Sequence, residues 1–94
     1  MQLEFEWDEE KSAKTLKERG ISFEEAKTVF RDPNSVTIFD YRHSENEDRF
    51  IDIGLSEHRR LLVVIYTERE TKIRIISCRK AELPEQWQYE RNKR

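Results

Sequence analysis

The longest apolar run in the chain covers residues 61–65, with the sequence LLVVI, and a second apolar segment follows at residues 73–76. Both segments are rich in β-branched residues, and the polar stretch between them is typical of a tight turn. A continuous apolar run is typical of a central strand that is covered on both faces. We therefore expect residues 61–80 to form a β-hairpin at the centre of the core.

The N-terminal third of the chain has both strand and helix patterns. Apolar and polar residues alternate over residues 3–7, which fits a short strand. Asp8 has the side chain of a helix N-cap and Gly20 is the usual residue at a helix end, so a surface helix is expected between them. Ser22 and Glu25 have the spacing of a capping box, which predicts a second helix that ends before Pro33.

A period-two pattern returns at about residues 36–41 and 49–56 and predicts two more strands, which form a meander with the hairpin. Past Arg79 a C-terminal helix is expected, with Pro84 in its first turn and Trp87 packed on the sheet, with stacking on a nucleic-acid base as the alternative for Trp87. The predicted fold is α+β, a single domain over residues 1–94 with two N-terminal helices, a four-stranded antiparallel sheet and one C-terminal helix. The alternation at residues 3–7 leaves open a short extra N-terminal strand.

Charged residues make up 40% of the 94 residues, yet the apolar residues form periodic segments, so we expect a folded chain. The net charge of -2 is unevenly divided: residues 1–60 hold 10 Lys and Arg against 15 Asp and Glu, and residues 61–94 hold 8 against 5. Acidic and basic halves indicate two partners of opposite charge, with ordinary solvated surface as the alternative. Without a signal peptide or membrane-length apolar run, a cytoplasmic protein without membrane contact is expected.

The predicted hairpin also carries many of the cations. Strict alternation along its second strand assigns the side chains to two faces: Lys72, Arg74, Ile76 and Cys78 on one, and Ile73, Ile75 and Ser77 on the other. Guanidinium and ammonium groups on one face of a strand favour a polyanionic ligand.

Cofactor chemistry is not expected. His43, His58 and the single Cys78 do not have zinc-ligand spacing, and the two glycines do not form a phosphate-binding loop, so neither a metal nor a cofactor is predicted. Arginines, carboxylates and hydroxyls suffice for metal-independent RNA cleavage, because RNA supplies its own 2′-hydroxyl nucleophile. The enzyme must then orient the phosphate, stabilise charge on its oxygens and protonate the leaving oxygen.

Seven segments together resemble the BrnT toxin family. They are residues 5–11 (FEWDEEK), 20–26 (GISFEEA), 43–45 (HSE), 47–50 (EDRF), 61–64 (LLVV), 66–69 (YTER) and 74–80 (RIISCRK). The resemblance implies a RelE-like fold and a ribonuclease toxin of a type II toxin-antitoxin pair that inhibits translation. It also implies a hetero-oligomer with a BrnA-like ribbon-helix-helix antitoxin, through which alone the toxin would contact DNA. The chain departs from the usual family residues at Thr15, Arg19 and Cys78.

Eight side chains are the predicted site. Arg79 is the leading phosphate and transition-state ligand, with a salt bridge to a nearby carboxylate as the alternative. Glu68 is the candidate base, with an exposed turn carboxylate as the alternative, and His43 is the candidate acid, with a loop histidine of no role as the alternative. The predicted contacts to the RNA backbone are Arg49, Arg74, Lys11, Lys80 and Arg19, and a surface ion pair is the alternative for the first three.

Two functions follow. The first is a metal-independent endoribonuclease that acts on single-stranded or ribosome-associated RNA until an antitoxin binds it. The second is a toxin-like binding module with weakened chemistry, which acts only in a complex with a DNA-binding antitoxin. Arg19 and Thr15 favour the second, because a guanidinium stays protonated and cannot replace a proton-transferring histidine.

Overall fold

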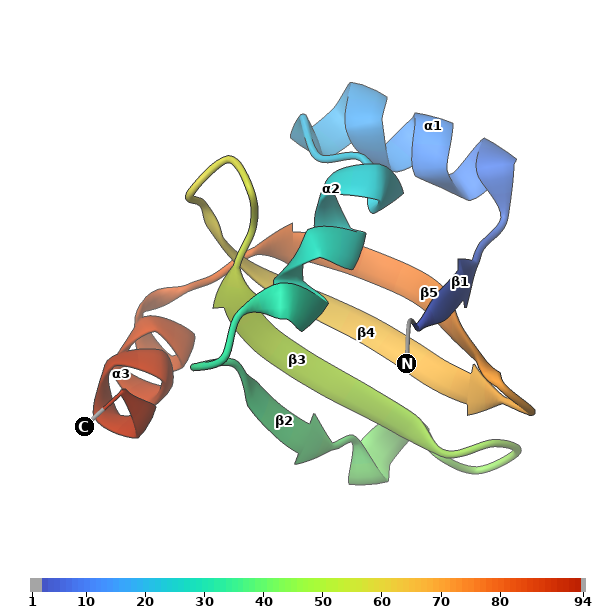
Figure 1. Cartoon of the computed structure of the whole chain (residues 1–94). Helices are drawn as coiled ribbons and strands as arrows, with labels where there is room; N and C mark the ends of the chain where they lie inside the picture. Colours follow the sequence, from blue (N-terminus) through green and yellow to red (C-terminus); the bar gives the residue numbers. More distant parts are fainter. Residues whose placement is uncertain (1–2, 94) are drawn as a thin grey trace.

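The computed structural model describes residues 3–93. Within this range a five-stranded sheet has the order β1-β5-β4-β3-β2 (Figure 1). Its strands are β1 (Glu4–Glu6), β2 (Val36–Phe39), β3 (Arg49–Leu55), β4 (Leu61–Arg69) and β5 (Lys72–Lys80). The expected central hairpin and antiparallel meander form β2 to β5.

The four-stranded antiparallel prediction is wrong in one respect, because the sheet is mixed. The alternating N-terminal segment adds as β1, and it runs parallel to β5 with Phe5 opposite Ile73. A short alternating pattern specifies which side chains are buried but not the strand direction. Here the direction follows from the edge that β5 leaves unpaired and from the packing of Phe5 against Phe30, whose ring centroids are 5.1 Å apart.

Three α-helices accompany the sheet: α1 (Glu9–Arg19), α2 (Phe23–Lys27) and α3 (Leu83–Asn92). The expected caps are present, because Asp8 accepts hydrogen bonds from the first turn of α1 and Gly20 ends that helix with φ of 73°. The second helix is shorter than predicted and continues as a 3-10 turn, η1 (Thr28–Arg31). None of the helices within residues 3–93 combines the length and apolar character needed to cross a membrane.

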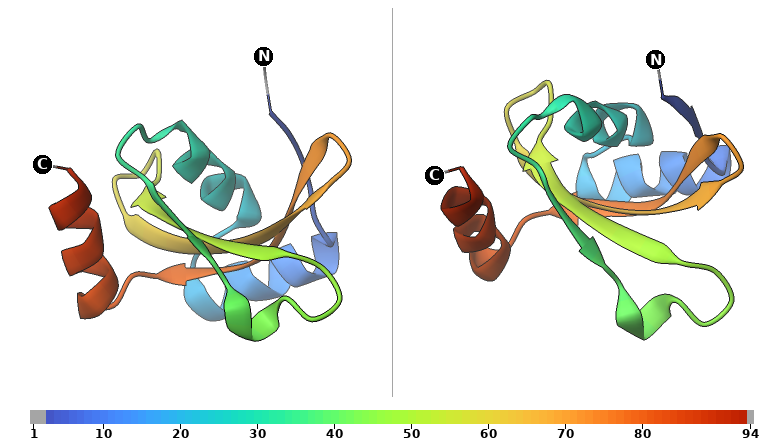
Figure 2. Two further views of the ribbon diagram at one scale, coloured as in Figure 1. Left: turned by 90° about the horizontal axis from the view of Figure 1, so that it is seen from below. Right: turned by 60° about the horizontal axis from the view of Figure 1, so that its bottom comes forward.

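The two faces of the sheet are unequally covered. We call the face under α2 and η1 the covered face; its buried core joins Ile21, Phe23, Ala26 and Val29 to Leu62, Val64, Ile75 and Cys78. The other face, here the open face, packs on α3 only at one end, where Tyr89 lies against Ile53 and Val63. Figure 2 shows α2 on one side of the sheet and α3 beside one end. The remaining open-face residues Ile51, Ile65 and Ser77 stay half-buried.

A β-bulge at Ile76 changes the face assignment of β5. Ile65 pairs with Ser77 and Tyr66 pairs with Ile75, so Ile76 has no partner residue in β4. The strict alternation that assigned Cys78 to the face of Arg74 is therefore wrong. Cys78 joins Ile75 in the covered core, whereas Arg74 shares the open face with Arg79.

The prediction that Trp87 packs on the sheet is also wrong. Trp87 is 62% exposed and Leu83 is 59% exposed, whereas Tyr89 is buried. The Tyr89 hydroxyl donates to Asp32 Oδ2 at 2.6 Å, and Asn92 Nδ2 donates to the Asn34 carbonyl at 3.0 Å. These bonds fix the orientation of α3, and burial together with the Asp32 bond raises the pKa of Tyr89 to about 12.

Candidate functional site

A cross-strand row of Arg49, Thr67 and Arg74 lies on the open face. Arg49 of β3 is opposite Thr67 of β4, and Thr67 is opposite Arg74 of β5. Neighbouring strands are about 4.8 Å apart, so the two arginines are separated by roughly 10 Å at the backbone. Side chains of this length reach a single phosphate group placed between them. The structure thus brings together two of the predicted RNA contacts.

Arg49 is incompletely satisfied. Its Nε is buried and has no hydrogen-bond partner, and its Nη2 lies 3.8 Å from Glu47 Oε2, beyond hydrogen-bond length. The same Glu47 lies 3.3 Å from Arg69 Nη2, so one carboxylate is shared between two guanidinium groups. A buried donor without an acceptor costs about 1–3 kcal/mol. The Arg49 side chain is 35% exposed, and the exposed end of its guanidinium is the part within reach of an anionic ligand.

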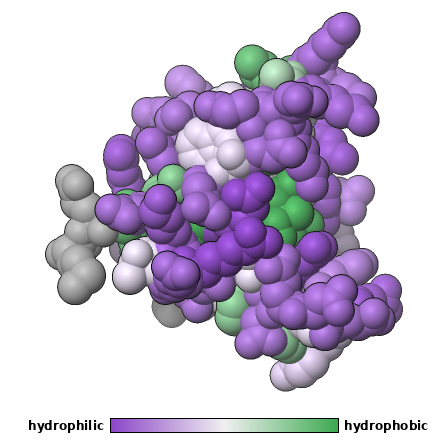
Figure 3. Space-filling view, turned by 90° about the vertical axis from the view of Figure 1, so that its right-hand side faces the viewer, coloured by the Kyte–Doolittle hydropathy of each residue, from purple (hydrophilic) through white to green (hydrophobic). Residues whose placement is uncertain are grey.

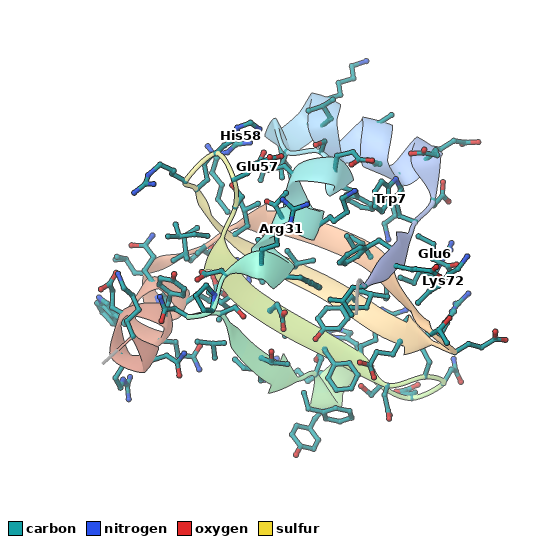
Figure 4. All side chains as sticks on the ribbon, in the orientation of Figure 1. Glu6, Trp7, Arg31, Glu57, His58 and Lys72 are labelled. Atoms are coloured by element: carbon teal, nitrogen blue, oxygen red, sulfur yellow. The ribbon has the colours of Figure 1, made fainter. Side chains whose placement is uncertain are left out.

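Arg74 has a single ion pair. Its Nη1 donates to Glu6 Oε2 at 3.1 Å, and both side chains are about one-third exposed. Figure 4 shows Glu6 beside Lys72 at this edge of the sheet. Because a guanidinium has five N–H donors, this pair leaves others free for an anion. The side of the molecule that carries β1 and the turn between β4 and β5 is predominantly hydrophilic with small apolar patches (Figure 3).

A hollow of about 320 Å³ in the connection between β2 and β3 adjoins the row. It is lined by Arg42, His43, Glu45, Asn46, Glu47 and Arg49. We call it the loop hollow. Arg49 belongs both to the loop hollow and to the cross-strand row, so the structure places His43 and Arg49, two predicted site residues, at one site.

His43 is paired with Asp40, a residue that the sequence predictions missed. His43 Nδ1 lies 2.9 Å from Asp40 Oδ2, and the Asp40 side chain is 10% exposed against 64% for that of His43. A carboxylate accepts but does not donate, so Nδ1 carries the proton in this pair and Nε2 is left for another partner. The three-residue spacing of the two side chains in a polar loop was the signal available in the sequence.

The backbone around this pair is held by a small hydrogen-bond network. The Asp40 amide donates to the Arg49 carbonyl at 2.8 Å. The Ser44 hydroxyl donates to the Asp40 carbonyl at 2.6 Å and accepts from the Arg49 amide at 2.9 Å. The 3-10 turn η2 (Tyr41–His43) is therefore fixed to the first residue of β3. These hydrogen bonds hold the backbone of His43 at a fixed position relative to the backbone of Arg49.

Arg79 lies on the open face but at the other end, next to α3. It is opposite Val63, four residues along β4 from Thr67, which corresponds to roughly 13 Å. Its guanidinium makes two bonds to Glu85, of 2.8 and 2.6 Å. The hydrogen bonds that Arg79 donates to Glu85 raise the pKa of Arg79 and lower the pKa of the Glu85 carboxyl. The salt bridge foreseen as the alternative for Arg79 is thus present.

The other predicted residues are dispersed. Glu68 is exposed near the end of β4 and pairs with Ile73, and Lys80 pairs with Leu62, so both belong to the covered-face register. Lys11 is exposed on α1, and Arg19 at the end of α1 donates to the Cys78 carbonyl at 2.7 Å. Arg19 therefore bonds to the backbone of β5 beyond residues 72–74, the part of this strand that pairs with β1.

No group of three or more His, Cys, Asp or Glu side chains within the described residues 3–93 is arranged to hold a metal ion. His58 lies in the turn between β3 and β4, far along the strands from the loop hollow (Figure 4).

An open sheet face with a row of arginines and an adjacent histidine–aspartate pair defines an α+β protein whose site suits a polyanion. The chain matches a family model described as the ribonuclease toxin, BrnT, of a type II toxin-antitoxin system over residues 7–85. The match covers most of the chain, so the chain belongs to the BrnT family of ribonuclease toxins. The resemblance of the seven sequence segments is confirmed, and membership implies an antitoxin partner.

The fold is similar to that of a solved structure, the 1.1 Å crystal structure of the Brucella abortus ribonuclease toxin BrnT. The TM-score is 0.64 at 19% sequence identity, and the match covers 86% of this chain and 99% of the other. No curated protein sequence matches the chain significantly. At this identity the structural match supports the fold, and the family model carries the functional class.

Proposed function

We propose that this chain is a metal-independent endoribonuclease that inhibits translation in the cytoplasm until a BrnA-like ribbon-helix-helix antitoxin binds it. The observation that carries the proposal is the Arg49, Thr67 and Arg74 row beside the loop hollow, in which Arg49 has a buried donor without an acceptor. RNA supplies the phosphate that this row lacks. We propose that this fold is shared with RelE-like ribonucleases. In this fold the open face of the sheet is available for substrate.

In the proposed reaction the 2′-oxygen attacks the neighbouring phosphorus, and the bond from phosphorus to the 5′-oxygen breaks. The products are a 2′,3′-cyclic phosphate and a 5′-hydroxyl. Arg49 and Arg74 stabilise the charge on the non-bridging oxygens, as planar guanidinium donors match phosphate geometry. His43, held by Asp40, gives a proton to the leaving 5′-oxygen. The 2′-hydroxyl proton passes to water, because Glu68, the predicted base, belongs to the covered-face register and lies on the opposite side of the sheet from the arginine row.

This assignment places Arg49 ahead of Arg79 as the main phosphate ligand. Both guanidinium groups lie on the open face, but the pair with Glu85 occupies Arg79, whereas Glu47 lies beyond hydrogen-bond length from Arg49. Removal of one donor that stabilises a developing oxyanion costs about 2.7–4 kcal/mol in the transition state. We expect that loss at Arg49.

The test uses the purified chain, free of antitoxin, incubated with total RNA in EDTA. The parent should cleave, and Arg49→Ala should cleave about a hundredfold to a thousandfold more slowly. His43→Gln should also lose most activity, because glutamine cannot transfer a proton. Arg91→Ala, which removes an exposed cation from α3, is the matched control and should keep the parental rate. Intact RNA with a folded parent, both free and on added ribosomes, would contradict the proposal.

The second candidate is a binding module with weakened chemistry that acts in a complex with its antitoxin. The specific observation in its favour is that Arg79 and Arg19 are both engaged within the chain, with Glu85 and with the Cys78 carbonyl. Expression in cells separates the two functions. Growth arrest that is relieved by the antitoxin and abolished by Arg49→Ala supports the ribonuclease, whereas normal growth supports the binding module.

A further inference from the structure

Tyr41 is the most exposed of the large apolar side chains in the described residues, at 85%. It is the first residue of η2, and it directly precedes Arg42 and His43, which line the loop hollow. A large aromatic ring exposed to water beside a candidate site is a candidate ligand contact, because it leaves a large apolar area in water.

The ring of Tyr41 is positioned by packing on one side. Its centroid lies 4.7 Å from that of Phe39 at an interplanar angle of 75°, and Phe39 in turn lies 5.6 Å from Phe50. Phe50 stacks on the buried Tyr66 with centroids 5.6 Å apart. The exposed ring is thus the last member of an aromatic series that begins in the core. Its position is defined even though most of its surface is in water.

The backbone of Tyr41 is also fixed relative to the arginine row. Its neighbour Asp40 donates through its amide to the Arg49 carbonyl at 2.8 Å, and Ser44 closes the turn through Asp40 and Arg49. Tyr41 and His43 are two residues apart, well within the span of one nucleotide. Phe50, on which this aromatic series rests, pairs with Tyr66 in the covered-face register, whereas Arg49 belongs to the open face. The turn that carries Tyr41 therefore connects an aromatic edge of the sheet to the loop hollow.

We propose that Tyr41 is a nucleobase-stacking residue, which holds a base of single-stranded RNA at the β2 edge of the sheet, where the RNA strand leaves the loop hollow. The inference rests on the proposed function for its substrate class. Every base has a π-face, so stacking on a preorganised ring binds single strands with little sequence preference. Stacking also requires an unpaired base, which gives the site a preference for single-stranded over duplex RNA.

The test measures binding separately from cleavage. A fluorescent single-stranded RNA with 2′-O-methyl groups binds without being cleaved, because the nucleophile is blocked, and its affinity is read by fluorescence anisotropy. Tyr41→Ala should weaken binding by about fivefold to a hundredfold, whereas Tyr41→Phe and Tyr41→Trp should stay within about twofold of the parent. Leu83→Ala, which removes an exposed apolar side chain from α3, should bind as the parent does.

An oligonucleotide with one abasic position completes the design. Scanning that position along the strand should find one place where the parent loses affinity and Tyr41→Ala loses no more, which is the signature of a direct contact. Equal loss of affinity at every abasic position in parent and variant would overturn the stacking role. So would unchanged affinity in Tyr41→Ala, or loss only of antitoxin binding.

The two proposals fail in different ways. Tyr41-dependent binding of the blocked RNA, with unmodified RNA left intact, would keep the stacking residue and remove the ribonuclease. Cleavage at the parental rate by Tyr41→Ala, with parental affinity, would keep the ribonuclease and remove the stacking residue.

Discussion

Arg60 and Arg49 show two uses of arginine in one small sheet protein. Arg60 binds both oxygens of the buried Glu25 and also donates to the Gly20 carbonyl at 2.9 Å, and Glu25 receives a further bond from Ser56 at 2.7 Å. Arg49 instead has one distant carboxylate and a buried donor without an acceptor. The first arginine is satisfied by its own chain, and the second needs a ligand. Both side chains are cationic, so charge does not distinguish the structural Arg60 from the candidate site residue Arg49. The hydrogen-bond partners of the two guanidinium groups do.

The largest difference should appear in unfolding by urea. Arg60→Ala leaves the Glu25 carboxylate buried without its main partner, and breaking such a pair costs about 3 kcal/mol. Arg49→Ala removes both a buried unpaired donor, which is a gain, and a packed side-chain stem, which is a loss, so the free energy of unfolding should change by less than about 1 kcal/mol. Equal losses of unfolding free energy in Arg60→Ala and Arg49→Ala would contradict the distinction between the two arginines. Arg60→Lys, which keeps the charge without the two-pronged geometry, should fall between them.

Arg79 provides an intermediate case. Its pair with Glu85 is two-pronged but partly exposed, so Arg79→Ala should cost about 1 kcal/mol of stability. We expect its cleavage rate to fall less than that of Arg49→Ala, because Arg79 lies at the α3 end of the open face. The measurement compares RNA cleavage rates and urea unfolding curves of the two variants. It shows which arginine contributes more to cleavage and which contributes more to stability. A larger loss of cleavage in Arg79→Ala would restore Arg79 as the leading phosphate ligand.

Acid should destabilise the fold by protonating the carboxylates that pair with Arg60 and Arg79. The hydrogen bond from Arg60 lowers the pKa of Glu25, and the bond from Arg79 lowers that of Glu85, each from an ordinary 4.5. Because the folded-state pKa values are lowered, this stability is complete above pH 4.5 and is lost as the pH falls through the lowered values. Urea midpoints measured between pH 7 and pH 2.5 should therefore drop below pH 4.5. In Arg60→Ala the drop should be shallower.

The smallest effect is expected at Asp52, where the sign is opposite. Burial raises the pKa of this carboxyl, which accepts from Tyr66 at 3.2 Å in the covered face. The charged form is therefore disfavoured in the fold, and stability falls as the pH rises from the ordinary pKa of 3.8 through the raised value. Asp52→Asn should be slightly more stable than the parent at pH 7. Thermal melts at pH 7 and pH 4 should show that this advantage shrinks in acid.

The sequence predicts the elements well because each has a local cause. The β-branched runs form β4 and β5, and the caps Asp8, Gly20 and Ser22 place the first two helices as expected. The capping box was half right: Ser22 accepts from the Glu25 amide, but the Glu25 side chain turns to Arg60 and Ser56 instead. A tertiary ion pair outcompeted a local bond.

Other features of the fold depend on contacts that no local pattern encodes. The bulge leaves Ile76 without a partner in β4, and because Ile75 and Ile76 are identical residues, the sequence gives no sign of which one is extra. Trp87 is exposed because Tyr89 and Asp32, distant in sequence, fix the orientation of α3.

The candidate site was predictable in its residue types and less so in its grouping. Arg49 and Arg74 meet only through the register of β4, which depends on the whole sheet. The pairing of Arg79 with Glu85 crosses from a strand into the helix that follows it, and it was foreseen only as an unnamed salt bridge. Asp40, in contrast, was within reach of the sequence, because it stands three residues before His43 in one loop.

The bulge also has a genetic consequence. Arg74 and Arg79 are five residues apart, an odd spacing that would place them on opposite sides of a regular strand, and the unpaired Ile76 restores them to the same side. Loss of the single codon for Ile76 would remove the bulge and leave Arg74 and Arg79 an even four residues apart, still on the same side. Cys78 would stay in the core and Arg79 on the open face, because each would keep its partner in β4. Homologous genes should accordingly tolerate loss of this codon more readily than the insertion of an extra codon between Ser77 and Arg79, which would place Arg79 on the covered face.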